Sequence, residues 1–334
     1  MTTLKPYALR WRILPQDPID MVITWASVND LNWRKNYEIH VKRKPQWQRH
    51  LEFGELELCL ASVCKYMPWI RNIFLITECK TPEYVNNNSK VKVIHSHDIL
   101  GKEALRPTFN SNVIESYMHR IPGLSECFLW GNDDFFVGQP IAKSYWFKDG
   151  LPSVKLGSRH LDYPIKGFEW SIYNAVRLAS KFTGSPPPPV PSIVRNHHRP
   201  TYINWEESTI LEQTHQINIL RKSACEMVWR LFPDFMRQMV VCRIRDPLEH
   251  QLQFHLLAAL VGIHAKNIHL DRLPPDHIRS SSFYDLESEE NFALWLTKVL
   301  ENPPPFYCIN GIRPSEINTF HNFKQLMLRR IHGK

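Results

Sequence analysis

Short apolar runs alternate with amphipathic stretches along the first 140 residues of the chain. Four runs bounded by polar or turn-forming residues have the length and composition of buried strands: Ile19–Thr24, 72–77, 91–95 and 127–130. Between them, apolar positions at helical spacing predict helices over residues 31–41, 55–65 and 112–120. Strands that alternate with helices in this way indicate an α/β fold built on a Rossmann-like, mostly parallel sheet.

The alternation fades after residue 147. Apolar spacing there predicts further helices over residues 169–182, 219–232, 248–261 and 318–330. The proline-rich stretch 185–191 must be extended, because proline fixes its own backbone angle and cannot donate a hydrogen bond. We therefore expect a Rossmann-like half over residues 1–150. A mainly helical half over residues 151–334 would close over the sheet and complete a single unit.

The charge balance favours an anionic partner. The chain of 334 residues carries a formal charge of +8 and is 43% apolar, as expected of a protein that buries a large core. A nucleotide, a phosphorylated sugar, a polyanionic polymer or a membrane surface would all complement this charge. The basic residues are dispersed and form no recognised nucleic-acid motif, so we expect no nucleic-acid partner.

The cysteines and the apolar segments indicate where the protein works. Seven cysteines are scattered without paired metal-type spacing, and several lie in apolar runs, as buried free thiols do. The first residues contain no signal-type apolar core, and no later run reaches transmembrane length. We expect a soluble protein of the cytoplasm, either free there or at the inner face of the membrane.

The candidate chemistry is concentrated directly after the strand at 127–130. Gly131 and Asn132 lead there into two adjacent carboxylates, Asp133 and Asp134. The carboxyl ends of parallel strands are where open α/β sheets bind ligands, and adjacent residues of a strand point in opposite directions. Carboxylate oxygens suit Mg²⁺ or Mn²⁺, and these ions suit a diphosphate. The alternative is a turn that merely ends the strand.

Four groups of residues together resemble the stealth protein family. The family includes bacterial capsule polymerases that transfer hexose-1-phosphate, and the catalytic subunit of the eukaryotic lysosomal-enzyme GlcNAc-1-phosphotransferase. The matching groups run from residue 18 to residue 311: Pro18 to Trp25 with Asp30 and Trp33; Glu55 to Ile73 with Pro107 to Asp134; Thr214 and His215 with Phe232, Pro233, Arg245 and Glu249; and Cys308 to Asn310.

The resemblance implies a GT-A-like fold and an enzyme that transfers a sugar 1-phosphate. Its donor would be a nucleotide sugar, most readily one linked to UDP, and its acceptor a hydroxyl of a capsule or exopolysaccharide glycan. The product would be a phosphodiester, and a nucleoside monophosphate would leave. Such a reaction needs positioning and charge stabilisation more than covalent chemistry from the protein. Residues 1–150 would bind the nucleotide sugar, and residues 151–334 would complete the active site.

The resemblance also assigns roles to residues. His215 would act as a base or donate to phosphate, and the planar fork of Arg245 suits phosphate oxygens. The predicted catalytic residues are His215, Arg245, Glu55 and Asp30, and the predicted metal ligands are Asp133 and Asp134. The predicted substrate-binding residues are Asp20, Thr24, Trp25, Asn110, Asn112, Arg221, Glu249 and Asn310.

Most of these residues also have a structural interpretation. Asp30 and the Asn110–Asn112 segment can cap helices, and Glu55 can be favoured by a helix dipole alone. Asp20 can simply end a strand in solvent, Trp25 can belong to the core, and His215 can be structural. Arg245 can form an ion pair with Asp246 or Glu249.

Two other functions stay open. One is an ordinary metal-dependent glycosyltransferase, which attacks the sugar carbon and releases a nucleoside diphosphate. The other is an inactive protein that binds sugar nucleotides, because Gly54, Ala61, Ile217 and Gly311 stand where the family usually has other residues. The family pattern of Arg245 and His215 favours phosphate transfer and predicts that these two side chains share one pocket.

Overall fold

The computed structural model describes most of the chain. The described residues are 12–45, 50–160, 167–184, 192–196, 199–203, 209–213, 215–273, 283–285 and 291–333. Thr214 and the stretch 185–191, which we expected to be extended, lie outside them.

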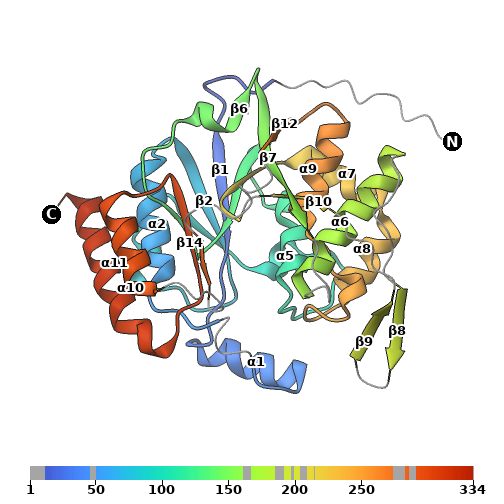
Figure 1. The fold of residues 1–334 in the computed structure, drawn as a ribbon, viewed down its shortest axis with the longest axis horizontal. Helices are drawn as coiled ribbons and strands as arrows, with labels where there is room; N and C mark the ends of the chain where they lie inside the picture. The colour runs from blue at the N-terminus through green and yellow to red at the C-terminus, as the bar shows by residue number, and fades with distance from the viewer. Residues whose placement is uncertain are drawn as a thin grey trace.

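A central sheet confirms the predicted α/β, Rossmann-like class (Figure 1). Its strand order is β11-β4-β1-β2-β3, and only β11 runs antiparallel to its neighbour. The strands are β1 (Ile19–Thr24), β2 (Ile70–Ile76), β3 (Val91–Ile94), β4 (Cys127–Asn132) and β11 (Asn218–Arg221). From β1 the chain first adds β2 and β3 on one side and then β4 on the other. The sheet therefore has a topological switch point between β1 and β4.

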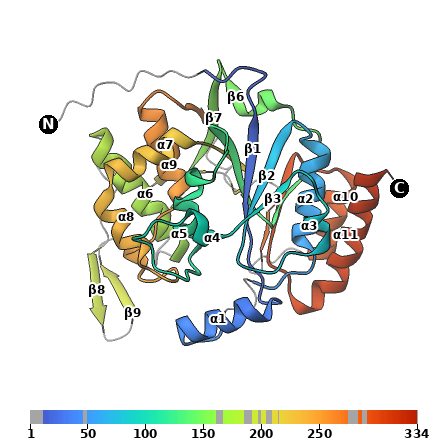
Figure 2. The same ribbon diagram turned by 180° about the vertical axis from the view of Figure 1, so that it is seen from behind.

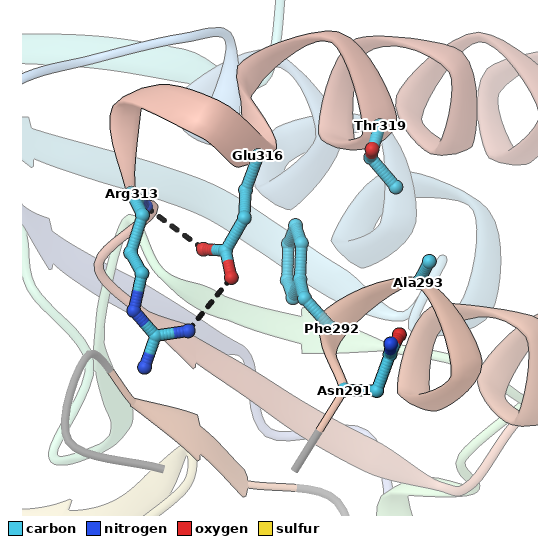
Figure 3. A pocket seen from close by; sticks show the side chains of 6 residues that line it. All are labelled: Asn291, Phe292, Ala293, Arg313, Glu316 and Thr319. Carbon is cyan, nitrogen blue, oxygen red and sulfur yellow. Dashed lines mark hydrogen bonds and ion pairs between the residues drawn. The ribbon is translucent and has the colours of Figure 1, made fainter. Parts of the chain in front are cut away.

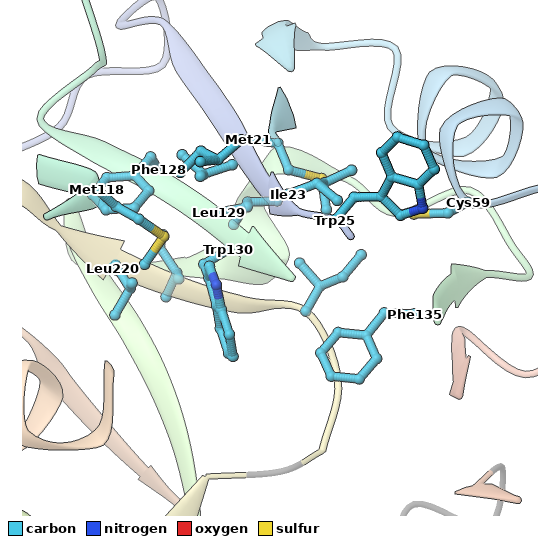
Figure 4. Close-up of a cluster of buried hydrophobic side chains, with 14 of the residues drawn as sticks. Met21, Ile23, Trp25, Cys59, Met118, Phe128, Leu129, Trp130, Phe135 and Leu220 are labelled. Atoms are coloured by element: carbon cyan, nitrogen blue, oxygen red, sulfur yellow. The ribbon is translucent and has the colours of Figure 1, made fainter. Parts of the chain in front are cut away.

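The inner strands of this sheet are apolar because helices cover both of their faces. Every residue of β1 is buried, as are the first five residues of β4. Figure 4 shows part of this core, with Met21 and Ile23 from β1 and Phe128 and Leu129 from β4. Continuous apolar runs of this kind are typical of parallel strands buried on both faces.

Helices flank the sheet on both sides (Figures 1 and 2). The helices of the first half are α1 (Leu31–Val41), α2 (Glu55–Tyr66), α3 (Glu83–Asn86), α4 (Ser96–Ile99) and α5 (Ser111–Ser116). The predicted bounds of α1 are confirmed, and α2 extends one residue beyond its prediction. The helix predicted over residues 112–120 is shorter. It ends at Ser116, and a separate 3₁₀ turn follows after Tyr117, η2 (Met118–Arg120).

The second half contains strands that the sequence analysis did not anticipate. Its helices are α6 (Gly167–Thr183), α7 (Lys222–Leu231), α8 (Pro233–Val240), α9 (Phe254–His264), α10 (Phe292–Glu301) and α11 (Ile317–His332). Its further strands are β7 (Leu151–His160), β8 (Ser192–Asn196), β9 (Arg199–Ile203), β10 (Thr209–Gln213), β12 (His269–Arg272), β13 (Phe283–Asp285) and β14 (Phe306–Asn310). Two more strands, β5 (Phe135–Val137) and β6 (Phe147–Lys148), belong to the first half.

These strands form smaller sheets around the central one. Strands β10, β7 and β12 make one sheet, with β6 paired to β7, and strands β13, β14 and β5 make another. Strands β8 and β9 form a separate two-stranded pair. The short 3₁₀ helices in the connections are η3 (Lys143–Trp146), η4 (Leu248–His250) and η6 (Pro314–Glu316).

Two predicted helices were wrong in part. The stretch 219–232 begins as strand β11, because Asn218–Arg221 pairs with β4, and helix α7 starts only at Lys222. The stretch 248–261 is interrupted between η4 and α9. The side chain of Asn174 donates there to the carbonyls of Glu249 (3.1 Å) and Gln251 (2.8 Å), which holds this segment against α6.

The two halves of the chain interleave. Strand β11 from the second half extends the central sheet beside β4, and β14 pairs with β5 of the first half. Helix α11 packs on α2 (Figure 1). Elements from both halves therefore surround the end of β4.

The seven cysteines are free, and all except the half-buried Cys64 are buried, which confirms the expectation of free thiols. Within the described residues, no helix combines the length and the apolar character needed to cross a bilayer.

Candidate active site

The carboxyl edge of the sheet at the switch point is formed by the last residues of β1 and β4. Thr24 and Asn132 are register partners in this parallel pair. The Thr24 hydroxyl donates to the side-chain oxygen of Asn132 at 3.0 Å. Directly after Asn132 the chain turns through Asp133 and Asp134 into β5, which belongs to a different sheet. The fold therefore presents both carboxylates at the place where open α/β sheets bind ligands.

Strand β14 fixes the backbone of this acidic turn. The Ile309 amide donates to the carbonyl of Asp134 at 3.1 Å, and the Cys308 thiol lies 3.5 Å from Asp134 Oδ2. Asp134 Oδ1 is buried and has no hydrogen-bond partner among the described residues. Asn310, a predicted substrate-binding residue, is exposed and directly follows Ile309. A buried carboxylate oxygen without a donor is costly unless a water, a ligand or a cation binds it.

Burial raises the pKa of each carboxylate near this turn, and neighbouring negative charges add to the effect for Glu55 and Asp133. Burial raises the pKa of Glu55 to about 7, and the charges of Glu52 and Asp134 add to the effect. Burial raises the pKa of Asp134 to about 6. The pKa of Asp133 lies well above its ordinary value because of burial and the charges of Asp134 and Glu55. Burial also raises the pKa of Glu52. Repulsion of this kind is relieved by a bound divalent cation.

Glu55 comes to this cluster from the first turn of α2, where it is only 6% exposed. One of its oxygens accepts from the backbone amide of Phe53, so the helix start and the carboxylate hold each other in place. The backbone at Gly54 has a positive φ of 106°, which favours glycine, and this residue is the N-cap of α2. The family departure at Gly54 therefore has a conformational reason.

His215 lies beside the acidic turn. Its ring makes edge-to-face contacts with Phe135 (centroids 5.0 Å apart) and Phe283 (4.9 Å). One potential ligand atom from each of Asp134, His215 and Cys308 lies within 4.8 Å of the other two. The structure thus brings together Asp134 and His215, which are 81 positions apart in the sequence. Sequence reasoning missed Cys308 as a site residue, and its place in the fourth family motif was the available signal.

Arg245 is exposed and donates to the Ser111 hydroxyl at the start of α5. Its loop is held by the buried side chain of Asn110, which donates to the carbonyls of Cys242 (3.2 Å) and Ile244 (3.0 Å). The Asn110 oxygen also accepts from the Asn112 amide, so the capping interpretation applies. The Asn112 side chain donates to Gln251 at 3.2 Å. Both asparagines therefore position the Arg245 loop by contacts within the protein.

Asp30 caps α1, as its structural interpretation expected. Its carboxylate accepts from the amides of Trp33 (2.8 Å) and Lys80 (2.7 Å). Trp33 and Tyr37 of α1 pack on Phe109, with ring centroids 5.5 and 4.9 Å apart. Asp30 thus ties α1 to the segment after β2.

The structure does not bring Asp20 to the carboxyl edge. Asp20 is the second residue of β1 and is fully buried near the amino end of the strand. Its carboxylate accepts from the Arg71 guanidinium, the Asn72 amide (3.1 Å) and the Ser125 amide (2.8 Å). These donors occupy both oxygens, so the observed role of Asp20 is structural.

Arg221 also lies away from this edge. It is 2% exposed and is paired in register with Cys127, the first residue of β4. Its guanidinium donates to Glu126 at 2.9 Å and to the carbonyl of Asn267 at 3.0 Å. The prediction that Arg221 lies in the substrate site was wrong because residues 219–221 belong to strand β11, which runs antiparallel to β4. Arg221, the last residue of β11, therefore lies at the amino end of β4 and not at its carboxyl end.

Trp25 directly follows β1 and is 7% exposed, in agreement with the core interpretation (Figure 4). Its indole N–H is nevertheless buried with no acceptor among the described residues.

Glu249, another predicted substrate-binding residue, lies in η4, where its carbonyl accepts from Asn174.

A buried polar pair beside β4 was also missed by sequence reasoning. His255 Nδ1 lies 3.6 Å from Glu115 Oε2, and both side chains are almost completely buried. The His255 ring stacks on Trp130, with centroids 4.2 Å apart. Trp130 precedes the acidic turn by three positions. The signal available for Glu115 was its place in the second family motif.

A hollow beside the C-terminal helices, shown in Figure 3, is separate from the candidate active site at the acidic turn. Glu316 accepts there from the backbone and the guanidinium of Arg313 (2.9 and 2.7 Å). The six residues that line it include none of the predicted site residues: Asn291, Phe292, Ala293, Arg313, Glu316 and Thr319.

A Rossmann-like sheet with an acidic turn at its switch point defines an α/β protein of the nucleotide-binding architecture. The model of the stealth protein conserved region 2 matches residues 49–154, which contain this turn. The chain is 28% identical over 317 residues to the capsular polysaccharide phosphotransferase fcs1 of Haemophilus influenzae, covering 91% of this chain and 81% of the relative. It is 26% identical to the capsular polysaccharide phosphotransferase LcbA of Aeromonas hydrophila, covering 96% and 86%.

These matches agree with the resemblance to the stealth protein family seen in the motifs. Among solved structures, the galactosyltransferase LgtC in complex with donor and acceptor sugar analogues matches with 10% identity and a TM-score of 0.40, covering 92% of this chain and 95% of that one.

Proposed function

We propose that the protein transfers hexose-1-phosphate or N-acetylhexosamine-1-phosphate from a nucleotide sugar to a hydroxyl of a glycan. The product is a phosphodiester in a capsule or exopolysaccharide, and a nucleoside monophosphate leaves. The observation that carries this proposal is the acidic turn at the switch point, where Asp134 offers a buried carboxylate oxygen without a donor. The names of the curated relatives, which are capsular and exopolysaccharide phosphotransferases, support the same reaction.

Asp133 and Asp134 would hold Mg²⁺ or Mn²⁺. Two adjacent carboxylates whose charged forms are disfavoured by burial suit a hard divalent cation, which would stabilise those charges. When bound, such a cation neutralises charge on a diphosphate. Cys308 and His215 also lie within reach of Asp134, but sulfur and nitrogen ligands select softer ions. The oxygen ligands therefore suit the cation, and His215 is left to move a proton.

The reaction assigns one task to each remaining residue. The acceptor oxygen attacks the phosphorus next to the sugar, and the bond from this phosphorus to the oxygen of the nucleoside monophosphate breaks. His215 accepts the proton of the acceptor hydroxyl, because a ring nitrogen can bind a proton near neutral pH. The Arg245 fork stabilises the negative charge on the phosphoryl oxygens. Glu55 orients the acceptor from the start of α2.

The two halves of the chain would act as one catalytic unit. Residues 1–150 supply the acidic turn and Glu55, and residues 151–334 supply His215, Arg245 and Asn310. The donor would be a UDP-linked sugar held at the ends of β1 and β4 by Thr24 and Trp25. The net charge of +8 suits an enzyme that works in the cytoplasm at the anionic inner face of the membrane.

Identification of the leaving group tests the proposal. The purified protein is incubated with Mg²⁺, a panel of nucleotide sugars and a capsule-type glycan acceptor, and the released nucleotides are quantified. Nucleoside monophosphate in step with a product that contains a phosphodiester is the expected result. Stoichiometric UDP with a phosphorus-free product would instead indicate an ordinary glycosyltransferase. Donor binding without any turnover would indicate an inactive binding protein.

A further inference from the structure

A second group of metal-ligand side chains lies at the ends of β2 and β3. One potential ligand atom from each of Glu78, His95 and His97 lies within 4.8 Å of the other two. Glu78 follows β2, His95 directly follows β3, and His97 belongs to α4 (Figure 2). The Thr77 amide donates to the carbonyl of Ile94 at 3.0 Å, so the parallel pairing continues up to these residues. Backbone pairing therefore brings the segments that carry the three side chains together.

The hydrogen bonds around the group orient each potential ligand. Both the amide and the hydroxyl of Ser96 lie 2.7 Å from Glu78 Oε1, which fixes the carboxylate. His97 Nε2 lies 3.3 Å from Asp98 Oδ1, so in the neutral ring the proton belongs on Nε2. His97 Nδ1 then faces Glu78 Oε1 at 3.5 Å with its lone pair. Outer partners of this kind are what metal-bound histidines use to fix their tautomer.

His95 completes the group. Its Nδ1 donates to the carbonyl of Thr77 at 3.1 Å, so in the neutral ring the lone pair available to a metal is on Nε2. The rings of His95 and His97 are stacked, with centroids 5.3 Å apart and an interplanar angle of 10°. The side chains of Glu78, His95 and His97 are 36%, 50% and 59% exposed, so an ion can enter from solvent and keep water as a further ligand.

We propose that Glu78, His95 and His97 bind a transition-metal ion of the Zn²⁺ class. Two imidazole nitrogens and one carboxylate are borderline ligands that suit Zn²⁺, Co²⁺, Ni²⁺ or Cu²⁺, whereas Mg²⁺ prefers oxygen. The site is therefore chemically distinct from the acidic turn at Asp133 and Asp134. Because β3 is the last strand in the order of the central sheet, the ion would tie this edge strand and α4 to the end of β2.

Spectroscopic titration with Co²⁺ tests the site. Full-length protein freed of metal by chelator is titrated with Co²⁺, and visible d–d absorption is recorded. Zn²⁺ is then added as a competitor. We expect saturable Co²⁺ bands that Zn²⁺ abolishes and Mg²⁺ leaves unchanged. His97→Ala and Glu78→Gln should each weaken binding at least about tenfold, and Asp98→Asn about tenfold through the orientation of His97.

Two controls locate the signal. His321→Ala and His332→Ala remove exposed histidines of α11 and should leave the Co²⁺ affinity unchanged. Cys308→Ser disables the other possible ligand group, formed by Asp134, His215 and Cys308, and should also leave these bands in place. If Cys308→Ser abolishes the signal, or if His97→Ala and Glu78→Gln bind Co²⁺ as the native protein does, the proposed site is wrong. An ion pair between the histidines and Glu78 would then account for the group.

Discussion

The hydroxyl of Thr24 donates to the side-chain oxygen of Asn132 at 3.0 Å, across the boundary between β1 and β4. This bond closes the switch point of the sheet one residue before the acidic turn begins. The backbone of Asn132 has a second partner, since the Cys59 thiol lies 3.8 Å from its carbonyl. The direction in which Asp133 leaves the sheet therefore depends on a contact between the first and the fourth strand.

Thr24→Val should lower turnover with a small loss of stability. Valine keeps the shape of threonine but removes the donor, so the unfolding free energy should fall by about 1 kcal/mol. Turnover should fall by more than the loss of folded protein explains, because the acidic turn loses the hydrogen bond from Thr24 to Asn132. Thr24→Ser keeps the hydroxyl and is the matched control. Kinetics and thermal melts of the two variants check this, and equal turnover in both would contradict it.

Asp133→Asn and Asp134→Asn should each stabilise the metal-free protein and abolish its metal-dependent activity. Each substitution replaces a carboxylate whose charged form is disfavoured by burial with a neutral amide, so without metal the melting temperature should rise. Metal-dependent turnover should be lost, because an amide is a poor ligand for Mg²⁺. Melting curves in chelator and activity in Mg²⁺ give the two readouts. Full activity of both variants in the presence of chelator would disprove the role of the turn.

Asp20→Ala should destabilise the protein without changing the affinity for a nucleotide sugar. It leaves the backbone amides of Asn72 and Ser125 without their acceptor, and an unsatisfied buried donor of this kind costs about 1 to 3 kcal/mol. Asp234→Ala, which removes an exposed partner of Arg237, is the control and should cost little. Denaturant unfolding and donor titration separate the two effects. A large rise in donor Kd with unchanged stability would restore Asp20 to the substrate site.

Arg245→Lys should lower turnover at least about tenfold, which is about 1.4 kcal/mol of transition-state stabilisation. An ammonium group cannot reproduce two parallel bonds to a phosphate. Arg237→Lys, on the exposed side of α8, is the matched control and should retain activity. Steady-state kinetics with saturating donor measure the effect. Equal rates for the two variants would exclude a bidentate contact between Arg245 and phosphate.

Without divalent cation, stability should fall as pH rises. Glu55 has a pKa of about 7 in the folded protein against an ordinary value of 4.5, so the folded state holds this proton more tightly than the unfolded chain. Its contribution is greatest at low pH and is lost as the pH rises from 4.5 to about 7. Glu55→Gln should flatten this part of the profile. Melting temperatures measured in chelator across this pH range test the prediction. If the melting temperature of Glu55→Gln falls with pH as steeply as that of the native protein, another titrating group causes the pH dependence.

The local pattern of the sequence determined most of the first half of the fold. The apolar runs of β1 and β4 and the spacing of α1 and α2 specify their own structure, because parallel strands are buried on both faces and helices on one. The same pattern placed Asp133 and Asp134 at the end of a buried strand. The family motifs added His215, which the structure places beside Asp134.

Only the tertiary structure decided what depends on pairing between distant segments. Residues 219–221 have apolar spacing that suits a helix, and they are a strand because the free edge of β4 accepts them. Asp20 and Asp30 looked alike as carboxylates near β1, yet Arg71 and Ser125 bury the first, while the backbone of Trp33 and Lys80 engages the second. Glu78 and His97 meet because β2 and β3 are neighbours. A sequence specifies local conformation through nearby side chains, whereas the partners of a buried charge are chosen by the packing of the whole chain.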